Sequence, residues 1–165
     1  MRAIVVYESL WGNTAAVARA IAEGIGPGAR ALSTSEATPA TSANADLIVA
    51  GAPVLGFSLP TEQMREGIRA NPGKGPTPPD LSAPSMRSWL ESVSKGHGRY
   101  AAFETRIWWS PGGATSGIAR ALGGAGYEPI AEAQRFIVKG RYGPLRTGEL
   151  ERARAWGADL AKAMA

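Results

Sequence analysis

The sequence of 165 residues contains no cysteine and only one histidine, His97. Without cysteine the chain cannot form a disulfide, a thiolate nucleophile, an iron–sulfur cluster or a thiolate zinc site. One histidine cannot build a histidine metal cluster by itself, and His97 lies between glycines in "SKGHGR", a pattern typical of a solvated loop. Any redox chemistry of this chain therefore has to come from a bound cofactor.

Long apolar runs are also missing from the sequence. Met1 and Arg2 are followed by the apolar residues Ala3 to Val6, a run that is too short for the core of a signal peptide. No stretch approaches the length that is needed to cross a membrane. These absences predict a cytoplasmic protein with no membrane span.

Runs of basic side chains are absent, although the chain is basic overall. Lys and Arg number 18 against 14 Asp and Glu, which gives a formal net charge of +4. Because the cations are scattered singly, the sequence lacks the footprint of a nucleic-acid-binding protein and favours a solvated basic surface. Such a surface is expected to speed association with an acidic partner protein, and to lose this advantage as salt increases.

Length and composition predict one globular domain over residues 1–165. A chain of this size can bury one core but is too short for two ordinary domains. It is 44% hydrophobic and contains 21 glycines and 12 prolines, a composition that is neither disordered nor collagen-like and that allows many turns.

Apolar segments typical of strands alternate along the chain with segments of helical periodicity. Strands are predicted at residues 3–7, 29–33, 47–52, 100–103 and 136–138, and helices at 17–25, 62–70, 86–93, 118–125 and 150–164. The β-branched run at 3–7 suits a central parallel strand, whereas the half-polar segment at 29–33 suits an edge. The alternation indicates βαβ units, and hence an α/β fold with a five-stranded parallel sheet covered by helices on both faces.

One long segment, at about residues 71–84, does not fit this alternation. It holds five prolines and two glycines between Pro72 and Pro84, which neither a helix interior nor a central strand accepts. We expect an exposed loop there. It is a candidate lid or partner-docking segment, and a tolerated surface insertion is an equally acceptable interpretation.

The first strand and the first helix are joined by Ser9-Leu10-Trp11-Gly12-Asn13-Thr14. Ligands of open α/β sheets bind beyond the carboxyl ends of the strands, where this segment is expected to lie. Two hydroxyls, the Asn13 amide and the backbone N–H groups at a helix start can cradle a dianionic phosphate without a cationic side chain. Gly12 allows a close backbone approach or positive φ, and Trp11 would flank the site.

The alternative interpretation of this segment is an ordinary helix N-cap. Asn13 or Thr14 alone would be sufficient for that role. The preceding strand and the additional hydroxyl of Ser9 favour the phosphate site over a simple cap.

The pattern "Y-E-S-x-W-G-N-T" after a strand resembles the phosphate loop of the flavodoxin-like family. The stretches "ADLIVAGAPV", "AAFETR" and "GELERARAWGADLA" are similar to parts of bacterial flavodoxin-domain proteins, actinobacterial ones among them, so the resemblance extends along nearly the whole chain. It implies a three-layer sandwich in which a five-stranded parallel sheet has the order 2-1-3-4-5. It also implies FMN at the carboxyl ends of the strands.

The same resemblance assigns cofactor-binding roles by position. The residues so assigned are Ser9, Leu10, Trp11, Gly12, Asn13 and Thr14 around the phosphate, and Ala52, Pro53, Val54, Leu55, Gly56, Thr105, Arg106, Trp108, Gly112 and Gly113 around the ring. The Leu55–Gly56 peptide is expected to hydrogen-bond flavin N5. Thr105 and Arg106 are expected at the polar edge of the ring, where positive charge stabilises reduced flavin, and Trp108 with Trp109 is expected to stack on the flavin or gate it.

Several of these positions have a purely structural interpretation as well. Trp108 and Trp109 can form a hydrophobic loop that packs on a helix or on a partner subunit. Arg106 can form a surface salt bridge with Glu104. The chain also departs from the family pattern, because many flavodoxins are acidic and because Val54-Leu55 stands where related proteins often carry polar or aromatic residues.

The function implied by this resemblance is that of an FMN-binding redox protein, which exchanges electrons with a partner protein or a small-molecule acceptor. An FMN-dependent quinone or porphyrinogen oxidoreductase is an alternative and would need a cavity over the ring. A flavin-free interaction module is another, in which the apolar 50s region and the Trp108-Trp109 pair bind another protein or subunit. The sequence alone does not separate these three functions.

Overall fold

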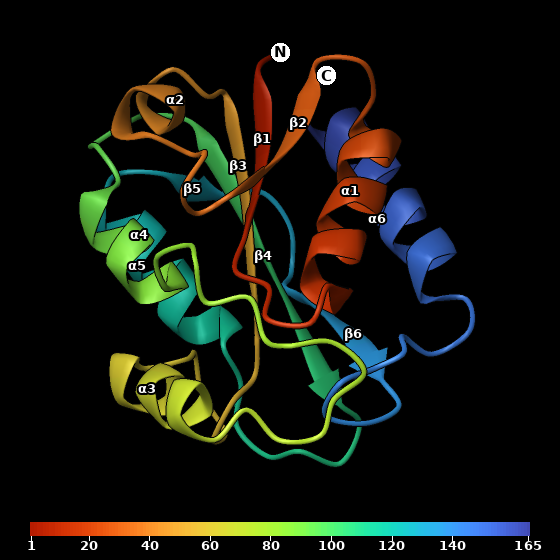
Figure 1. Cartoon of the computed structure of the whole chain (residues 1–165). Helices are drawn as coiled ribbons and strands as arrows, with labels where there is room; N and C mark the ends of the chain where they lie inside the picture. The colour runs from red at the N-terminus through yellow and green to blue at the C-terminus, as the bar shows by residue number, and fades with distance from the viewer.

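A parallel sheet forms the centre of the structure, a computed structural model that describes residues 1–165 (Figure 1). Its strands are β1 (Ala3–Tyr7), β2 (Ala29–Ser33), β3 (Leu47–Pro53), β4 (Arg99–Ile107), β5 (Glu128–Pro129) and β6 (Gln134–Val138). They are arranged in the order β2-β1-β3-β4-β5, and β6 also pairs with β4. The predicted parallel sheet in order 2-1-3-4-5 is therefore confirmed.

The fifth position of this sheet holds two short strands, where the sequence predicts one. β5 pairs with the start of β4, at Arg99 and Tyr100, and β6 pairs with its second half, from Phe103 to Ile107. Both residues of β5, Glu128 and Pro129, are exposed, so no apolar pattern marks this strand in the sequence. The expected count of five strands is thus short by one minor strand.

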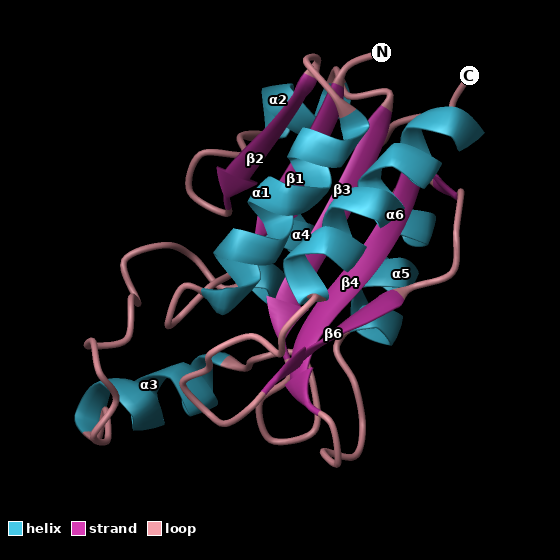
Figure 2. Ribbon diagram, turned by 90° about the vertical axis from the view of Figure 1, so that its right-hand side faces the viewer, coloured by secondary structure: helices cyan, strands magenta, loops and turns pink.

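Helices cover both faces of the sheet, as predicted (Figures 1 and 2). They are α1 (Asn13–Ile25), α2 (Pro39–Ala43), α3 (Glu62–Ala70), α4 (Met86–Ser92), α5 (Thr115–Gly124) and α6 (Glu149–Ala163). α1 and α6 pack on the face that contains Val5 and Phe103, and α4 and α5 pack on the face that contains Val6 and Ile48. None of these helices is both long enough and apolar enough to span a membrane.

Two helical details differ from the pattern-based expectation. α2 lies in a Ser/Thr/Ala-rich stretch without helical periodicity, and it begins at a polar cap in which Thr38 Oγ1 accepts a hydrogen bond from the Thr41 N–H at 3.2 Å. Leu150 follows the apolar spacing of the last helix, yet its side chain is 37% exposed. It lies in the first turn of α6, next to the buried Glu149.

The carboxyl ends of β1, β3 and β4 meet at one edge of the sheet, in the lower half of Figure 1. In the parallel register Tyr7 of β1 aligns with Gly51 of β3, and Pro53 of β3 aligns with Thr105 of β4. The segments that follow these strands therefore lie side by side. α3 lies at the same edge, apart from the helices that cover the faces (Figure 2).

Close contact between α1 and α6 depends on two glycines. A Cβ on Gly24 would overlap the backbone carbonyl of Arg154, and a Cβ on Gly157 would overlap that of Ile21. Any larger side chain at either position would force the two helices apart, and with them the packing over this face of the sheet.

Gly157→Ala is therefore expected to lower the free energy of unfolding by about 1–3 kcal/mol through overpacking, although alanine has the higher helix propensity. Gly123→Ala in α5 is the matched control, because a Cβ there would meet nothing within 4 Å. The control should be neutral or more stable by up to about 1 kcal/mol. Urea unfolding followed by circular dichroism measures both changes, and equal effects would contradict the close contact.

Candidate functional site

The segment between β1 and α1 forms a compact loop around the Ser9 side chain. Ser9 Oγ accepts hydrogen bonds from the N–H groups of Gly12 and Ala15, each at 3.2 Å. Gly12 precedes α1 with a φ of 91°, a left-handed conformation that glycine adopts without strain. Because the Ser9 hydroxyl accepts both bonds, its own proton remains available for donation to a ligand.

Other donors of this first loop also have no acceptor within the protein. The N–H groups of Ser9, Leu10 and Trp11 form no hydrogen bond with another residue. Those of Asn13 and Thr14 begin α1, where a helix offers no internal acceptor. Together with the positive end of the helix dipole, these groups provide what an anion such as phosphate needs.

The side chains of Asn13 and Thr14 have partners in distant segments. Thr14 Oγ1 and Thr105 Oγ1 share a buried hydrogen bond of 2.8 Å. Asn13 Nδ2 donates to the Tyr142 carbonyl at 3.2 Å. Both side chains, which the sequence assigns to a phosphate, thus also fix the first loop against β4 and against the segment after β6. Each arrangement leaves one proton free, on the amide of Asn13 and on one hydroxyl of the threonine pair.

The loop after β3 forms a tight two-residue turn. The Leu55 N–H donates to the Ser58 carbonyl at 2.9 Å, and the Ser58 N–H donates to the Leu55 carbonyl at 3.0 Å. The central residues, Gly56 and Phe57, have φ of 51° and 69°, as a type I′ turn requires. The peptide that joins Leu55 to Gly56 therefore has its carbonyl occupied, while its N–H forms no hydrogen bond in the protein.

A buried ion pair organises the loop after β4. Arg106 Nη1 donates to Glu104 Oε2 and to the Gly112 carbonyl, both at 2.8 Å. Glu104 Oε1 accepts from the N–H groups of Ala114 and Thr115 at 3.1 and 3.3 Å, and so caps α5, which has no side-chain cap of its own. The sequence allows Arg106 either a contact with the flavin or a surface salt bridge with Glu104. The structure contains the Glu104 pair, but the pair is buried and not at the surface.

The loops after β3 and β4 contact each other directly. The Gly113 N–H donates to the Phe57 carbonyl at 3.0 Å. Gly112 has a φ of 75°, and a Cβ on it would overlap the same carbonyl. In the structure, Gly112 and Gly113 therefore serve the contact between the two loops.

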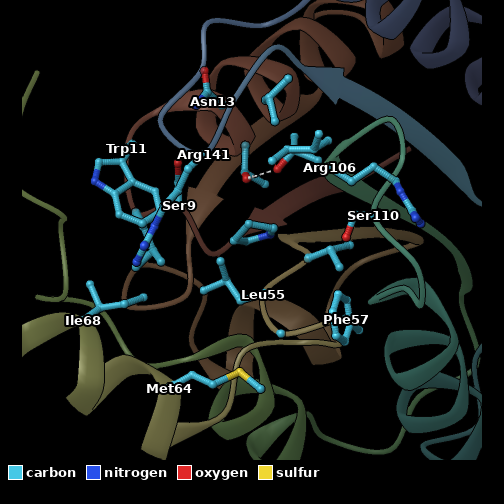
Figure 3. Close-up of a pocket in the computed structure, with 18 of the residues that line it drawn as sticks. Ser9, Trp11, Asn13, Leu55, Phe57, Met64, Ile68, Arg106, Ser110 and Arg141 are labelled. Carbon is cyan, nitrogen blue, oxygen red and sulfur yellow. Dashed lines mark hydrogen bonds between the residues drawn. The ribbon is translucent and has the colours of Figure 1, made fainter. Parts of the chain in front are cut away.

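The three loops surround a cavity of about 600 Å³ (Figure 3). The predicted residues that line it are Ser9, Leu10, Trp11, Asn13, Thr14, Pro53, Val54, Leu55, Gly56, Thr105 and Arg106. The predicted residues that do not line it are Gly12, Ala52, Trp108, Gly112 and Gly113. Of the tryptophan pair, Trp109 lines the cavity, whereas Trp108 is 74% exposed.

Sequence patterns do not identify two parts of the cavity wall. α3 contributes Met64, Gly67 and Ile68, its C-cap contributes Asn71, and the segment after β6 contributes Arg141. The periodicity of α3 predicts a helix but not what it packs against. Arg141 follows the last strand, so the rule that ligands gather at carboxyl strand ends is the signal that points to it.

Arg141 joins Trp11 and Tyr142 in a cluster beside Ser9, at one end of the cavity (Figure 3). The guanidinium carbon of Arg141 lies 5.6 Å from the centre of the Trp11 ring and 5.7 Å from that of Tyr142. The two rings meet edge to face at 5.1 Å. The Trp11 Nε1 is buried without an acceptor, so the indole N–H forms no hydrogen bond within the protein.

Comparison with solved structures identifies the fold of this chain. No protein-family model and no curated protein matches the sequence. Among solved structures, a flavodoxin from the domain Archaea is similar with a TM-score of 0.68 and 21% identity over 99% of each chain. Oxidised flavodoxin 1 from Bacillus cereus has a TM-score of 0.68 and 15% identity over 98% of each chain. The chain has the flavodoxin-like fold.

A larger protein contains a similar unit. The flavodiiron core from Synechocystis matches 99% of this chain with a TM-score of 0.64 and 22% identity, and the match covers 36% of that protein. At these low identities the likeness concerns the fold. The chemistry of this flavodoxin-like chain has to be argued from its own residues.

Residues 71–84, between α3 and α4, form a strap over the first loop of this flavodoxin-like chain. The Asp80 N–H donates to the Leu10 carbonyl at 2.8 Å. Gly73 and Gly75 approach the Tyr142 side chain so closely that a Cβ on either glycine would lie too near to it. Although most of its residues are exposed, the strap is therefore attached to the segments that surround the cavity.

A second buried ion pair attaches the other end of the strap. Arg65 of α3 donates to Glu8 Oε2 at 2.6 Å and to the Ala83 carbonyl at 2.5 Å, and the Met86 N–H donates to Glu8 Oε1 at 2.9 Å. Both charged side chains are almost fully buried. Burial raises the pKa of Glu8, while the Met86 N–H and the Arg65 guanidinium act in the opposite direction. The Met86 N–H and the Arg65 guanidinium thus both favour the ionised form of Glu8.

Glu149, the first residue of α6, anchors the segment that carries Arg141. Its carboxylate accepts hydrogen bonds from the Ile137 N–H at 2.6 Å, from Arg152 at 2.9 Å and from Arg146 at 3.2 Å. Burial acts to raise the pKa of Glu149, but the hydrogen bonds from Arg152, Ile137 and Arg146 outweigh it and lower the pKa below its usual range.

Loss of the Arg65 guanidinium should be costly. Arg65→Met is expected to lower the free energy of unfolding by about 3–5 kcal/mol, since Glu8 would be left buried without its partner. Arg69→Met on the same helix is the matched control, because its pair with Glu66 is exposed and such pairs contribute about 0–1 kcal/mol. Guanidinium chloride unfolding measures both variants. Equal losses would show that the Glu8 pair is no more important than a surface pair.

At low pH, Glu149 should no longer contribute to the stability of the fold. Because its pKa is lower in the folded state, the ionised carboxylate stabilises the fold above the usual glutamate range, and this stabilisation is lost as the pH falls through the folded-state pKa. Glu149→Gln should lower the thermal unfolding midpoint at neutral pH, and the difference should shrink in acid. Glu151→Gln, exposed in the same turn, is the control. A difference that does not change with pH would contradict this role.

Proposed function

We propose that this chain is an FMN-binding redox protein that transfers electrons through the bound flavin. The observation that carries the proposal is the cavity at the carboxyl ends of β1, β3 and β4, which has unpaired donors for an anion at one end. In open α/β sheets this edge is where ligands bind. Flavodoxins from Archaea and from Bacillus cereus share the fold, which supports the choice of flavin.

The size and lining of the cavity fit FMN. A volume of about 600 Å³ lies within the range of roughly 300–1,000 Å³ that small-molecule sites occupy. No carboxylate lines the cavity, which suits a ligand with a dianionic phosphate. Leu55, Met64 and Ile68 supply apolar surface for a flat ring, between the Ser9 end and the Phe57 end (Figure 3).

Bound FMN supplies the redox chemistry, because a flavin accepts and releases one or two electrons. The residues of the chain bind and orient it. The first loop would hold the phosphate with its N–H groups and the Ser9 hydroxyl, and the loops after β3 and β4 would enclose the ring. Glu104 neutralises Arg106, so Arg106 contributes little net positive charge to the edge of the ring.

The electrons are exchanged with a redox partner protein or a small-molecule acceptor. A net charge of +4 favours an acidic partner, because opposite charge raises the rate of encounter. Phe57 and Trp109, which line the cavity, are exposed by 59% and 62%, and the adjacent Trp108 is exposed by 74%. They offer apolar contact area at the place where electrons would leave the flavin.

The purified chain is expected to bind FMN, seen as quenched flavin fluorescence and as a yellow chromophore that co-elutes with the protein. Ser9→Ala should weaken binding by about 1–3 kcal/mol, because it removes one donor to the phosphate and frees the N–H groups of Gly12 and Ala15. Ser116→Ala, exposed on α5, should leave FMN affinity unchanged.

Ser9→Ala breaks hydrogen bonds only between the Ser9 side chain and nearby residues of the same loop and helix start. Thr14→Ala and Asn13→Ala should also weaken FMN retention, but each breaks a bond to Thr105 or Tyr142 and so loosens the site as well. A colourless chain that fails to quench FMN fluorescence would overturn the proposal. It would favour the flavin-free interaction module, with Phe57, Trp108 and Trp109 as its contact surface.

A further inference from the structure

Arg141 differs from the other cationic side chain of the cavity wall. Arg106 also lines the cavity, but its charge is balanced by Glu104 at 2.8 Å. Arg141 has no carboxylate partner and no hydrogen bond within the protein; its contacts are with the rings of Trp11 and Tyr142. A guanidinium that rests on aromatic rings keeps its N–H edge available for an anion. Arg141 is therefore the one uncompensated positive charge on the cavity wall.

Arg141 lies at the end of the cavity that is next to the first loop, where the phosphate is proposed to bind. Arg141 lies with Trp11 and Ser9, whereas Phe57 and Ser110 mark the other end of the cavity (Figure 3). Trp11 belongs to the first loop, so its contact with Arg141 brings the guanidinium to the segment that carries the unpaired N–H groups.

The segment that carries Arg141 is held in place by several contacts. The Tyr142 carbonyl accepts from Asn13, the Tyr142 ring packs on Gly73 and Gly75 of the strap, and Glu149 accepts from the Ile137 N–H where the segment leaves β6. Arg141 itself is exposed and takes no part in these contacts. Its side chain is thus presented by a fixed backbone and can be replaced without dismantling it.

We propose that Arg141 binds the phosphate of the ligand and makes the chain select a phosphorylated flavin over the uncharged riboflavin. This inference rests on the proposed FMN function. A guanidinium forms charge-assisted, often bidentate hydrogen bonds with phosphate, and these are roughly twice as strong as neutral ones. The neutral donors of the first loop hold the phosphate, and Arg141 adds the charge that separates FMN from riboflavin. Arg141 is thus a specificity-determining residue that lies outside the phosphate loop.

The test compares two ligands on four proteins. Dissociation constants for FMN and riboflavin are measured by fluorescence quenching at low and high salt, with the unmodified chain, Arg141→Ala, Arg141→Glu and Arg30→Ala. Arg30 is exposed on β2 at the amino end of the sheet, so Arg30→Ala removes the same charge far from the cavity. Thermal unfolding without ligand checks that each variant is folded.

Arg141→Ala is expected to weaken FMN binding about tenfold or more at low salt and to leave riboflavin binding unchanged within about twofold. Arg141→Glu should weaken FMN binding further, because it places a carboxylate beside the phosphate. High salt should reduce the difference between the unmodified chain and Arg141→Ala. Arg30→Ala should behave as the unmodified chain with both ligands.

Two results would overturn the inference while the proposed function stands. One is FMN binding that Arg141→Ala leaves intact. The other is an equal loss for FMN and riboflavin, which would assign Arg141 to general support of the cavity. If the unmodified chain binds neither flavin, both the inference and the proposed function are overturned.

Discussion

The buried ion pair of Glu8 and Arg65 is the interaction on which the candidate site depends. Glu8 follows β1 directly, Arg65 belongs to α3, and the same two side chains hold the Ala83 carbonyl of the strap and the Met86 N–H at the start of α4. The end of β1, α3, the strap and the start of α4 are thus joined at two charged groups with almost no contact with water. The first loop begins at Ser9, directly after Glu8. The partners of Glu8, Arg65 and the Met86 N–H, therefore fix the point from which this loop starts.

Charge in and around the cavity is distributed unevenly between its two ends. Glu104 neutralises Arg106 behind the ring end, and in doing so it caps α5 and orders the loop that contains Gly112. At the other end the first loop offers neutral donors, and Arg141, from the segment after β6, contacts Trp11 of that loop. The strongest attraction for an anion is therefore at the end of the cavity that has the most unpaired donors.

Most of the fold follows from local patterns in the sequence. The continuous apolar runs of β1 and β3 and the periodicity of α1 and α6 predict the parallel sheet and its covering helices, and the structure confirms them. β5 and α2 are too short and too polar to leave an apolar pattern. The first loop is predictable because its donors are consecutive in the sequence. The partners of Asn13 and Thr14 are not, since they lie 129 and 91 residues away and are decided by packing between segments. For the same reason, neither the α3 wall of the cavity nor the contact of Arg141 with Trp11 is encoded in a local pattern.

The tight turn after β3 has a further consequence. Phe57 adopts a left-handed backbone conformation, which costs a side chain of this kind about 1–2 kcal/mol, and the hydrogen bonds of Leu55, Ser58 and Gly113 keep it there. Phe57 is consequently 59% exposed at the wall of the cavity instead of packing in the core. Three of the five large apolar side chains that the protein exposes are Phe57, Trp108 and Trp109. These three side chains form the largest group of exposed apolar residues in one region of the chain. Self-association in concentrated solutions is therefore expected to start there, and any molecule that covers them should improve solubility.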